Sequence, residues 1–413
     1  MYTFTLDNGL RCVLTRRAGS AMAVVDVLYN VGSRDERRGL TGMAHLFEHL
    51  MFGGSANVPS FDAELERAGG NSNAWTSTDF TNFYDILPAC NLPTALWLES
   101  DRMLALSFSH RTLEVQRSVV IEEFKQTHLN MPYGDLQHRL RRLAYAQEHP
   151  YSWPTIGLEP AHIAAVTGED VRSWFYAHYA PDNAILSIVA PQPEAEVEAL
   201  VRQWFGDIPR RNIAQRRLPS PGFPDADVSE TVVADVPQPR IVLAYPMSGY
   251  GTAEYFAADT LTDILAYGRS GRFVRRLLNG PVEGLFAGAD ASIIGSEHEG
   301  LLLLNAVLDA DASSEADIDR AIEMMDGEFR ALARPGDISD ADLERTLNNF
   351  EASYHYDGAD ARELAFRQAL AVYHGEDPDS MVAARRKLTP SELEATASAI
   401  ASRPSVKLVY TSE

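Results

Sequence analysis

The order of apolar and polar positions along the chain predicts short strands that alternate with amphipathic helices. Residues 3–16 read as a β-hairpin with Asp7-Asn8-Gly9 at its turn, because Asn-Gly supplies the positive φ angles that a tight turn needs. Residues 23–30 are almost continuously apolar and predict a buried strand. The same reasoning predicts extended segments at 71–87, 184–190, 240–245 and 406–410. It predicts helices at 60–69, 94–106, 111–129 and 254–267, and a capped helix start at 166–171.

Residues 40–54 predict a helix with two unlike faces. At about 100° per residue, five apolar side chains form the stripe of a helix packed on a core: Met43, Leu46, Phe47, Leu50 and Met51. His45, Glu48 and His49 lie together on the opposite side. Side chains four residues apart on a helix have Cβ atoms about 5–6 Å from each other, so the two histidines can bind one metal ion. Glu48 then reaches a metal-bound water without being a ligand.

This His-x-x-Glu-His order is the inverse of the His-Glu-x-x-His zinc helix. The short pattern also fits two structural histidines, but the register that keeps all three polar groups off the apolar stripe favours a metal site. Thr41 is the expected N-cap of this helix, and Gly53-Gly54 is its expected end. The other histidines lack the spacing of metal ligands, and we interpret them as surface or structural residues.

Length and composition describe a globular protein of about two domains. The chain has 413 residues, of which 45% are hydrophobic, and a formal net charge of −22. Such an acidic chain is a poor partner for nucleic acid and for anionic membrane surfaces. It can accept a basic peptide, although solubility alone also explains the charge.

The cysteines and the first residues favour a cytoplasmic protein. Cys12 and Cys90 are the two thiols of the chain and form no Cys-x-x-Cys pair, which indicates a reducing compartment without a disulfide framework. The N-terminus has no basic segment followed by a long apolar one. No run approaches the roughly 18 apolar residues that a membrane helix needs.

The two halves of the chain repeat one pattern on either side of a linker. Residues 211–236 are rich in Pro, Arg and Ser, so we expect domains at 1–210 and 237–413. Beyond the linker, 240–245 echoes 23–29, 254–267 takes the place of the metal helix, and 387–393 with 406–410 repeats 166–171 with 184–190. When Gly53 is aligned with Gly268, Asp263 and Ile264 stand opposite Glu48 and His49. The second domain therefore lacks the metal set.

Several further runs accompany the metal helix. They are Gly32-Ser-Arg-Asp-Glu36, the Asn73-Ala74 step, Asp101-Arg102, Arg117-Ser-Val-Val-Ile-Glu-Glu123, His149-Pro-Tyr151 and Tyr179-Ala-Pro-Asp-Asn183. With the helix they resemble the pitrilysin-type (inverzincin, family M16) zinc metallopeptidases, in their short bacterial and mitochondrial-processing-peptidase-like branch. The resemblance covers essentially the whole chain and is strongest over 27–130.

The resemblance implies an α+β fold of two homologous domains in tandem, each a mostly antiparallel sheet packed with helices, that together form half of a clamshell. The first domain is then the catalytic, zinc-binding one. It implies a zinc-dependent endopeptidase that hydrolyses peptides and small or unfolded proteins. The alternative is that the chain is not an enzyme but a non-catalytic structural or peptide-binding subunit. Such family members tend to have damaged metal motifs, whereas the metal motif of this chain is intact.

The resemblance also implies the remaining site residues. The third zinc ligand of the family falls on Glu123, with Glu122 and Glu114 as fallbacks. Gln116 stands where the family usually has a glutamate, and its amide can still hydrogen-bond a ligand. In the family, the residue that matches Glu48 moves protons as a general base and acid.

The family's substrate segment matches Asn73 and Ala74, on an edge strand to which a peptide adds as an extra β-strand. In the family, one half of a dimer supplies zinc and the other supplies an Arg and, seven residues later, a Tyr that hold the substrate. In this chain, Gly280 and Ala287 stand at those positions. A shifted alignment would bring in Arg275, Arg276 or Phe286 instead. The resemblance therefore implies a heterodimer with a paralogous subunit in preference to a homodimer.

Overall fold

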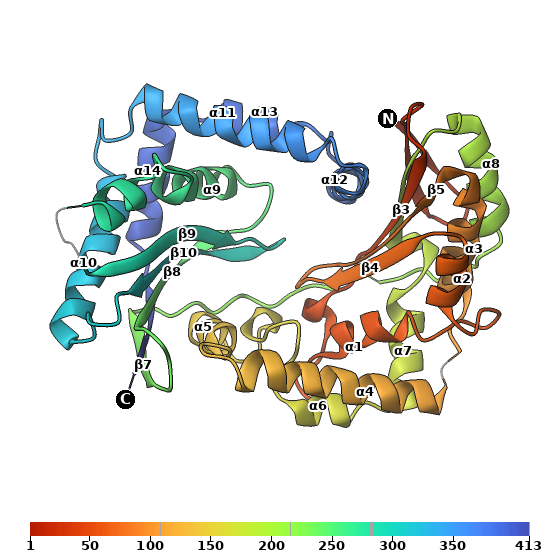
Figure 1. Ribbon diagram of the computed structural model, residues 1–413, viewed down its shortest axis with the longest axis horizontal. Helices are drawn as coiled ribbons and strands as arrows, with labels where there is room; N and C mark the ends of the chain where they lie inside the picture. The colour runs from red at the N-terminus through yellow and green to blue at the C-terminus, as the bar shows by residue number, and fades with distance from the viewer. Residues whose placement is uncertain (108, 215, 281–283, 413) are drawn as a thin grey trace. The chain divides into compact units, whose positions relative to one another are not determined.

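The computed structural model describes residues 1–107, 109–214, 216–280 and 284–412 and divides into two compact units (Figure 1). Unit 1 contains residues 1–125, 153–218 and 354–378, and unit 2 contains 126–152, 219–353 and 379–413. The chain therefore passes between the units more than once. Among the described residues, no helix is both long and apolar enough to cross a membrane.

Unit 1 is built on a six-stranded sheet in the order β1-β2-β6-β3-β5-β4. Its strands are β1 (Tyr2–Thr5), β2 (Arg11–Arg16), β3 (Met22–Tyr29), β4 (Asn71–Thr76), β5 (Thr81–Pro88) and β6 (Ala184–Ala190). β1 pairs antiparallel with β2 across Asp7-Asn8-Gly9, which confirms the predicted hairpin. Only the β2–β6 pair is parallel among the pairs of this sheet, and β4 forms one edge.

The two faces of this sheet carry different helices. Most of the helices of unit 1 share one core on one face: α1 (Met43–Leu50), α2 (Phe61–Arg67), α3 (Leu92–Leu104), α4 (His110–Phe124), α6 (Pro160–Ala164), α7 (Gly168–His178) and α8 (Glu194–Phe205). Val25 and Val27 of β3 point into that core, whereas Val24 and Leu28 pack against α12 (Ala361–His374) on the other face. This alternation is the period of two expected for a strand buried on both sides.

Unit 2 has a five-stranded sheet in the order β7-β11-β8-β10-β9. Its strands are β7 (Val228–Val233), β8 (Arg240–Ser248), β9 (Phe286–Ile294), β10 (Glu299–Leu308) and β11 (Val406–Thr411). Its helices are α5 (Leu136–Ala144), α9 (Ala253–Ala266), α10 (Glu315–Ala331), α13 (Ser380–Arg386) and α14 (Pro390–Ala401), while α11 (Asp340–Asp357) runs from unit 2 into unit 1. As in unit 1, one pair of strands, β7 with β11, is parallel.

The two sheets have the same topology, which confirms an α+β fold of two similar halves. β2-β6-β3-β5-β4 corresponds strand for strand to β7-β11-β8-β10-β9, with the single parallel pair at the same place. The compact units nevertheless differ from the predicted ranges 1–210 and 237–413. Helix α5 from the first half contacts β8 and β11 of the second sheet, and α12 from the second half contacts β3 and β6 of the first. The predicted linker 211–236 also contains β7.

Candidate metal centre and active site

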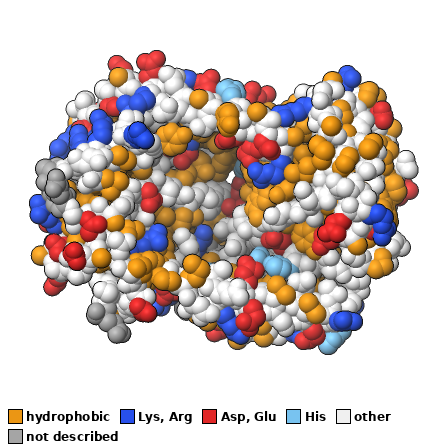
Figure 2. Space-filling view, in the orientation of Figure 1, with side chains coloured by type: hydrophobic (Ala, Val, Ile, Leu, Met, Phe, Trp, Pro, Cys, Tyr) orange, Lys and Arg blue, Asp and Glu red, His pale blue; other side chains and the backbone are white. Residues whose placement is uncertain are grey.

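The helix α1 has the two faces that its sequence predicts. Met43, Leu46, Phe47 and Leu50 are buried in the core of unit 1. His45, Glu48 and His49 are partly exposed. The helix ends at Leu50, and the turn that follows reaches Gly54, whose φ of 96° favours glycine. Over α1, Figure 2 shows histidine side chains at the surface with acidic side chains beside them.

The start of α1 differs from the prediction. Its N-cap is Gly42, with a φ of 86° and no side-chain cap, so the expectation that Thr41 caps the helix is wrong. Thr41 instead accepts a hydrogen bond from the Leu158 N–H and contacts His162 Nδ1. The first N–H groups of the helix are bound by Glu36, whose Oε2 accepts from Gly42 N at 3.0 Å and whose Oε1 accepts from Ala44 N at 2.8 Å.

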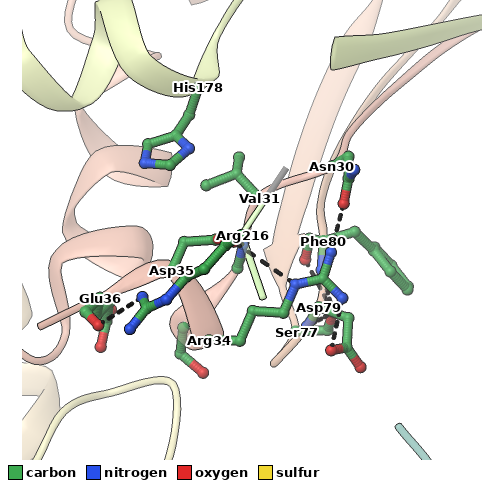
Figure 3. A network of polar contacts seen from close by, with 12 residues as sticks. Asn30, Val31, Arg34, Asp35, Glu36, Ser77, Asp79, Phe80, His178 and Arg216 are labelled. Carbon is green, nitrogen blue, oxygen red and sulfur yellow. Dashed lines mark hydrogen bonds and ion pairs between the residues drawn. The ribbon is translucent and has the colours of Figure 1, made fainter. Parts of the chain in front are cut away.

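Figure 3 shows Glu36 joined to Arg216 at one side of a network of polar contacts. The indole Nε1 of Trp153 donates to Glu36 Oε2 at 3.0 Å, and the Arg216 guanidinium donates to the Glu36 backbone carbonyl at 2.9 Å. The carboxyl group is fully buried. Burial raises the pKa of Glu36, and the hydrogen bonds from Ala44, Gly42 and Trp153 oppose that rise; because all three partners are N–H donors, the ionised carboxylate is the form that fits this geometry.

Helix α4 brings Glu123 to the two histidines of α1. The Glu123 Oε1 atom lies 3.8 Å from His45 Nε2, and Oε2 lies 3.5 Å from His49 Nε2. One ligand atom from each of the three residues falls within 4.8 Å of the others. Ligands at about 2.0–2.1 Å from a tetrahedral zinc ion stand roughly 3.4 Å apart, so two imidazoles and this carboxylate fit zinc with little movement.

The fallback ligands are engaged elsewhere. Glu122 is exposed and forms an ion pair with Lys125 at 2.6 Å, and Glu114 pairs with Arg117 and with His110. Gln116 hydrogen-bonds His49. The structure therefore brings Glu123 to the histidines and leaves Glu122 and Glu114 away from them.

The charges around the histidines favour their binding to a cation. Burial disfavours the His49 imidazolium, but hydrogen bonds to Glu123 and Gln116 and the charges of Glu48 and Glu123 outweigh burial and raise the pKa of His49. A divalent metal would replace that proton as the positive partner of the carboxylates.

Glu48 lies beside the metal set and is bound by a residue of the neighbouring strand. Its Oε2 accepts a hydrogen bond of 2.5 Å from Thr76 Oγ1 at the end of β4. Burial raises the pKa of Glu48, Glu123 adds to the rise, and Thr76 and His49 oppose it. A raised carboxyl pKa improves proton transfer near neutral pH.

The predicted substrate segment forms the free edge of the sheet. Asn73 and Ala74 lie in β4, which pairs on one side with β5 through Asn73–Tyr84 and Ala74–Phe83. The Ala74 N–H donates a hydrogen bond of 2.8 Å to the side-chain oxygen Oδ1 of Asn73. An unpaired strand edge can add a peptide as a further strand. Because Thr76 of the same strand contacts Glu48, such a peptide would run past the metal set.

Two residues of the site were not predicted from the sequence. Glu36 and Thr76 both bind α1, one at its backbone and one at Glu48. The only sequence signal for Glu36 was its place in the Gly32–Glu36 run. Thr76 carried none, because its role depends on which helix packs beside β4.

The segment expected to lack a substrate clamp lies in unit 2. Gly280 follows the π-helical turn η6 (Val274–Leu278), and Ala287 is exposed on β9, while 281–283 lie outside the described residues. A Cβ atom at Gly280 would stand 1.9 Å from the Arg276 carbonyl oxygen, so no side chain fits there without a backbone shift. Of the alternatives, Phe286 is buried and Arg276 pairs with Glu328 at 2.8 Å.

Comparison with known families agrees with the two halves. Residues 11–157 match the family model "Insulinase (Peptidase family M16)", and residues 165–350 match "Peptidase M16 inactive domain". The first match contains His45, Glu48, His49 and Glu123. The region that matches the domain described as inactive contains none of them.

Individual relatives carry related names. The chain is 29% identical over 360 residues to "Zinc protease PqqE" of Helicobacter pylori, which covers 85% of this chain and 78% of that protein. It is 28% identical over 204 residues to "Probable mitochondrial-processing peptidase subunit beta, mitochondrial" of Arabidopsis thaliana, covering 49% and 38%. The crystal structure of a protease from Helicobacter pylori superposes with a TM-score of 0.88 at 26% identity over 99% of both chains. The chain belongs to the M16, pitrilysin-type, peptidase family.

Proposed function

We propose that this chain is a zinc-dependent endopeptidase that hydrolyses peptides and small or unfolded proteins. The observation that carries the proposal is the meeting of His45, His49 and Glu123 from two packed helices, with Glu48 beside them. Two imidazoles and one carboxylate leave a position for water, as in catalytic zinc sites. A structural zinc site would use all four positions for protein ligands.

The proposed reaction divides between the metal and Glu48. Held by His45, His49 and Glu123, zinc would polarise the scissile carbonyl and make the attacking water more acidic. The Glu48 carboxylate takes a proton from the attacking water as the new C–O bond forms. It then delivers that proton to the amide nitrogen as the C–N bond breaks, so that water is consumed and one acid and one amine result. Thr76 orients the carboxylate through Oε2.

The substrate in this proposal is an extended peptide. It pairs with the edge of β4 at Asn73 and Ala74, displacing the Asn73 side chain from the Ala74 N–H, and backbone hydrogen bonds supply most of the affinity. Pairing through the backbone depends little on sequence, which suits a substrate without fixed structure.

The test is to measure zinc content and cleavage of a peptide library by mass spectrometry. We expect one zinc per chain and cleavage that a chelator abolishes and added zinc restores. Zinc binding without cleavage of any peptide would favour the alternative, a non-catalytic structural or peptide-binding subunit. The family name "Peptidase M16 inactive domain" supports that alternative for residues 165–350 only.

We further propose that the efficient enzyme is a heterodimer with a metal-free paralogous subunit of the same family. The support is the segment with Gly280 and Ala287, since neither residue can donate a side-chain hydrogen bond to a substrate carbonyl. Gly280 also has no space for a longer side chain. A homodimer would have two metal sites and no Arg/Tyr clamp, whereas the heterodimer would have one of each.

The partner proposal is tested by an assay of the chain alone and then mixed with a paralogue encoded beside it. We expect a large rise in kcat/KM on mixing. Full activity of the isolated homodimer would refute the proposal. We also propose that the protein acts in the cytoplasm, a location supported by the free thiols of Cys12 and Cys90. Cell fractionation would test that location.

A further inference from the structure

We propose that Glu36 is a positioning residue of the metal site: its buried carboxylate fixes the first turn of α1 and thereby the place of His45. The inference rests on the proposed function as far as zinc binding is concerned. It assigns to Glu36 a role that is separate from the ligands and from Glu48.

The geometry at the helix start carries the inference. Gly42 N and Ala44 N donate to the two oxygens of Glu36 at 3.0 and 2.8 Å, and the next residue after Ala44 is His45. The N–H groups of a first helical turn have no partner within the helix. In α1 a side chain from outside the helix supplies that partner, in place of the usual capping residue. The carboxylate therefore fixes the position and orientation of the helical turn that carries His45.

Three donors converge on this carboxylate. Besides the two backbone groups, Trp153 Nε1 donates at 3.0 Å and also lies 3.3 Å from the Ser33 carbonyl. Trp153 is 1% exposed, so its ring is fixed by packing. A carboxylate has two oxygens and can accept from all three donors, whereas an amide has one acceptor oxygen and an NH₂ group that would face a donor. A negative group is also favoured at a helix N-terminus.

The surroundings leave the first turn little freedom to compensate. A Cβ at Gly42 would stand 2.7 Å from the Ile156 carbonyl oxygen, so the loop before the helix is closely packed. The backbone of Glu36 is itself fixed in place, because the Arg216 guanidinium donates a hydrogen bond to the Glu36 backbone carbonyl. Helix α1 has only eight residues, so a shift of its first turn reaches both His45 and His49.

The experiment compares Glu36→Gln with Asp26→Asn in the full chain. Asp26 is a matched control: it is a fully buried carboxyl of the same unit whose pKa burial also raises to about 8, and it is bound by Asn82 on the α12 side of the sheet. Zinc affinity is measured by competition with a chelator at a temperature where both variants are folded. The visible spectrum of bound Co²⁺ reports the ligand geometry.

We expect Glu36→Gln to weaken zinc binding about tenfold, the lower end of the range for residues that orient metal ligands. Its Co²⁺ bands should also shift, whereas Asp26→Asn should keep the affinity and spectrum of the unaltered chain. Loss of stability alone would lower the melting temperature without moving either signal. An unchanged zinc affinity and Co²⁺ spectrum in Glu36→Gln would overturn the inference.

A second variant covers the case in which Glu36→Gln does not fold. Trp153→Phe removes the donor that holds Glu36 Oε2, the oxygen that also accepts from Gly42 N, so the carboxylate is less firmly placed; we expect a loss of zinc affinity of about threefold, smaller than for Glu36→Gln, with a Co²⁺ shift in the same direction. No change in either signal would overturn the inference in that case. Zinc binding that depends on Glu36 in a chain that cleaves no peptide would support the inference and refute the proposed activity.

Discussion

Replacement of Glu48 by Gln tests the proposed reaction most directly. The two side chains have the same shape, and the Gln amide oxygen can still accept the hydrogen bond that Thr76 Oγ1 donates to Glu48 Oε2. Glu48 is outside the set His45, His49 and Glu123, so the variant should keep its fold and its zinc. What it loses is the capacity to accept and deliver a proton.

The expected fall in kcat follows from the loss of this one proton-transfer group. A positioned general acid–base group contributes about 10²–10⁴ in rate, which corresponds to about 2.7–5.4 kcal/mol of barrier. Glu48 would serve in both proton transfers of one turnover. We therefore expect kcat to fall at least about a hundredfold, while KM changes little because the β4 edge that pairs with the peptide is untouched.

The assay is steady-state cleavage of one peptide from the library, with zinc measured in the same preparation. Glu122→Gln is the matched control, because Glu122 undergoes the same chemical change on α4 but is exposed and paired with Lys125. That control should keep kcat within about twofold. A Glu48→Gln variant with full zinc and a kcat within about threefold of the unaltered chain would refute the mechanism.

Three other predictions test separate parts of the site and fold. Glu123→Gln should lose zinc, measured by metal analysis, with circular dichroism unchanged; full zinc occupancy would exclude Glu123 as a ligand. Thr76→Val should keep zinc but lower kcat about tenfold, since Glu48 loses its orienting hydrogen bond; unchanged kcat would refute that role. Asp26 has a folded pKa of about 8 and an ordinary value of 3.8, so its contribution to stability is present below pH 3.8 and is lost as pH rises through 8. The free energy of unfolding, measured with denaturant between pH 4 and 8, should therefore fall more steeply with pH for the unaltered chain than for Asp26→Asn, by on the order of 1 kcal/mol per pH unit. Equal slopes in the two proteins would contradict the raised pKa of Asp26.

Local patterns predicted the elements and the metal helix because they depend on near neighbours in the chain. The turn at Asp7-Asn8-Gly9 and the apolar run of β3 are properties of a few consecutive residues. The two faces of α1 follow from the helical period, so the gathering of His45, Glu48 and His49 was visible without a structure. Glu123 lies on another helix, and its place came from the family resemblance, since periodicity alone left Glu122 and Glu114 open.

The exchange of helices between the halves could not be predicted from the same patterns. The apolar face of α5 shows that the helix is half-buried, but an apolar face fits either of two similar sheets. The structure packs α5 on the second sheet and α12 on the first. The cap of α1 was mispredicted for a related reason: Thr41 has the right chemistry, but Glu36 reaches the same N–H groups and Thr41 binds Leu158 instead.

The second half of the chain shows that this fold supports the metal site without requiring it. Helix α9 follows β8 as α1 follows β3, and alignment of Gly53 with Gly268 puts Thr260, Asp263 and Ile264 at the places of His45, Glu48 and His49. Thr260 donates to the Phe256 carbonyl within its own helix, and Ile264 is buried in the core of unit 2.

Asp263 retains a carboxyl group at the place of Glu48, but its surroundings give it another use. It accepts from the Arg385 guanidinium at 3.1 Å, and Arg385 is 3% exposed and also pairs with Asp259. Burial raises the pKa of Asp263 to about 6, so its protonation does not set it apart from Glu48; the difference is that its carboxylate pairs with a cation and that Thr260 and Ile264 stand at the places of the two histidines. Glu48 has a hydroxyl partner and two imidazoles in place of that cation. The chemistry of the chain therefore depends on which residues occupy one helix of a repeated fold, and the proposed activity belongs to α1 and α4 of unit 1.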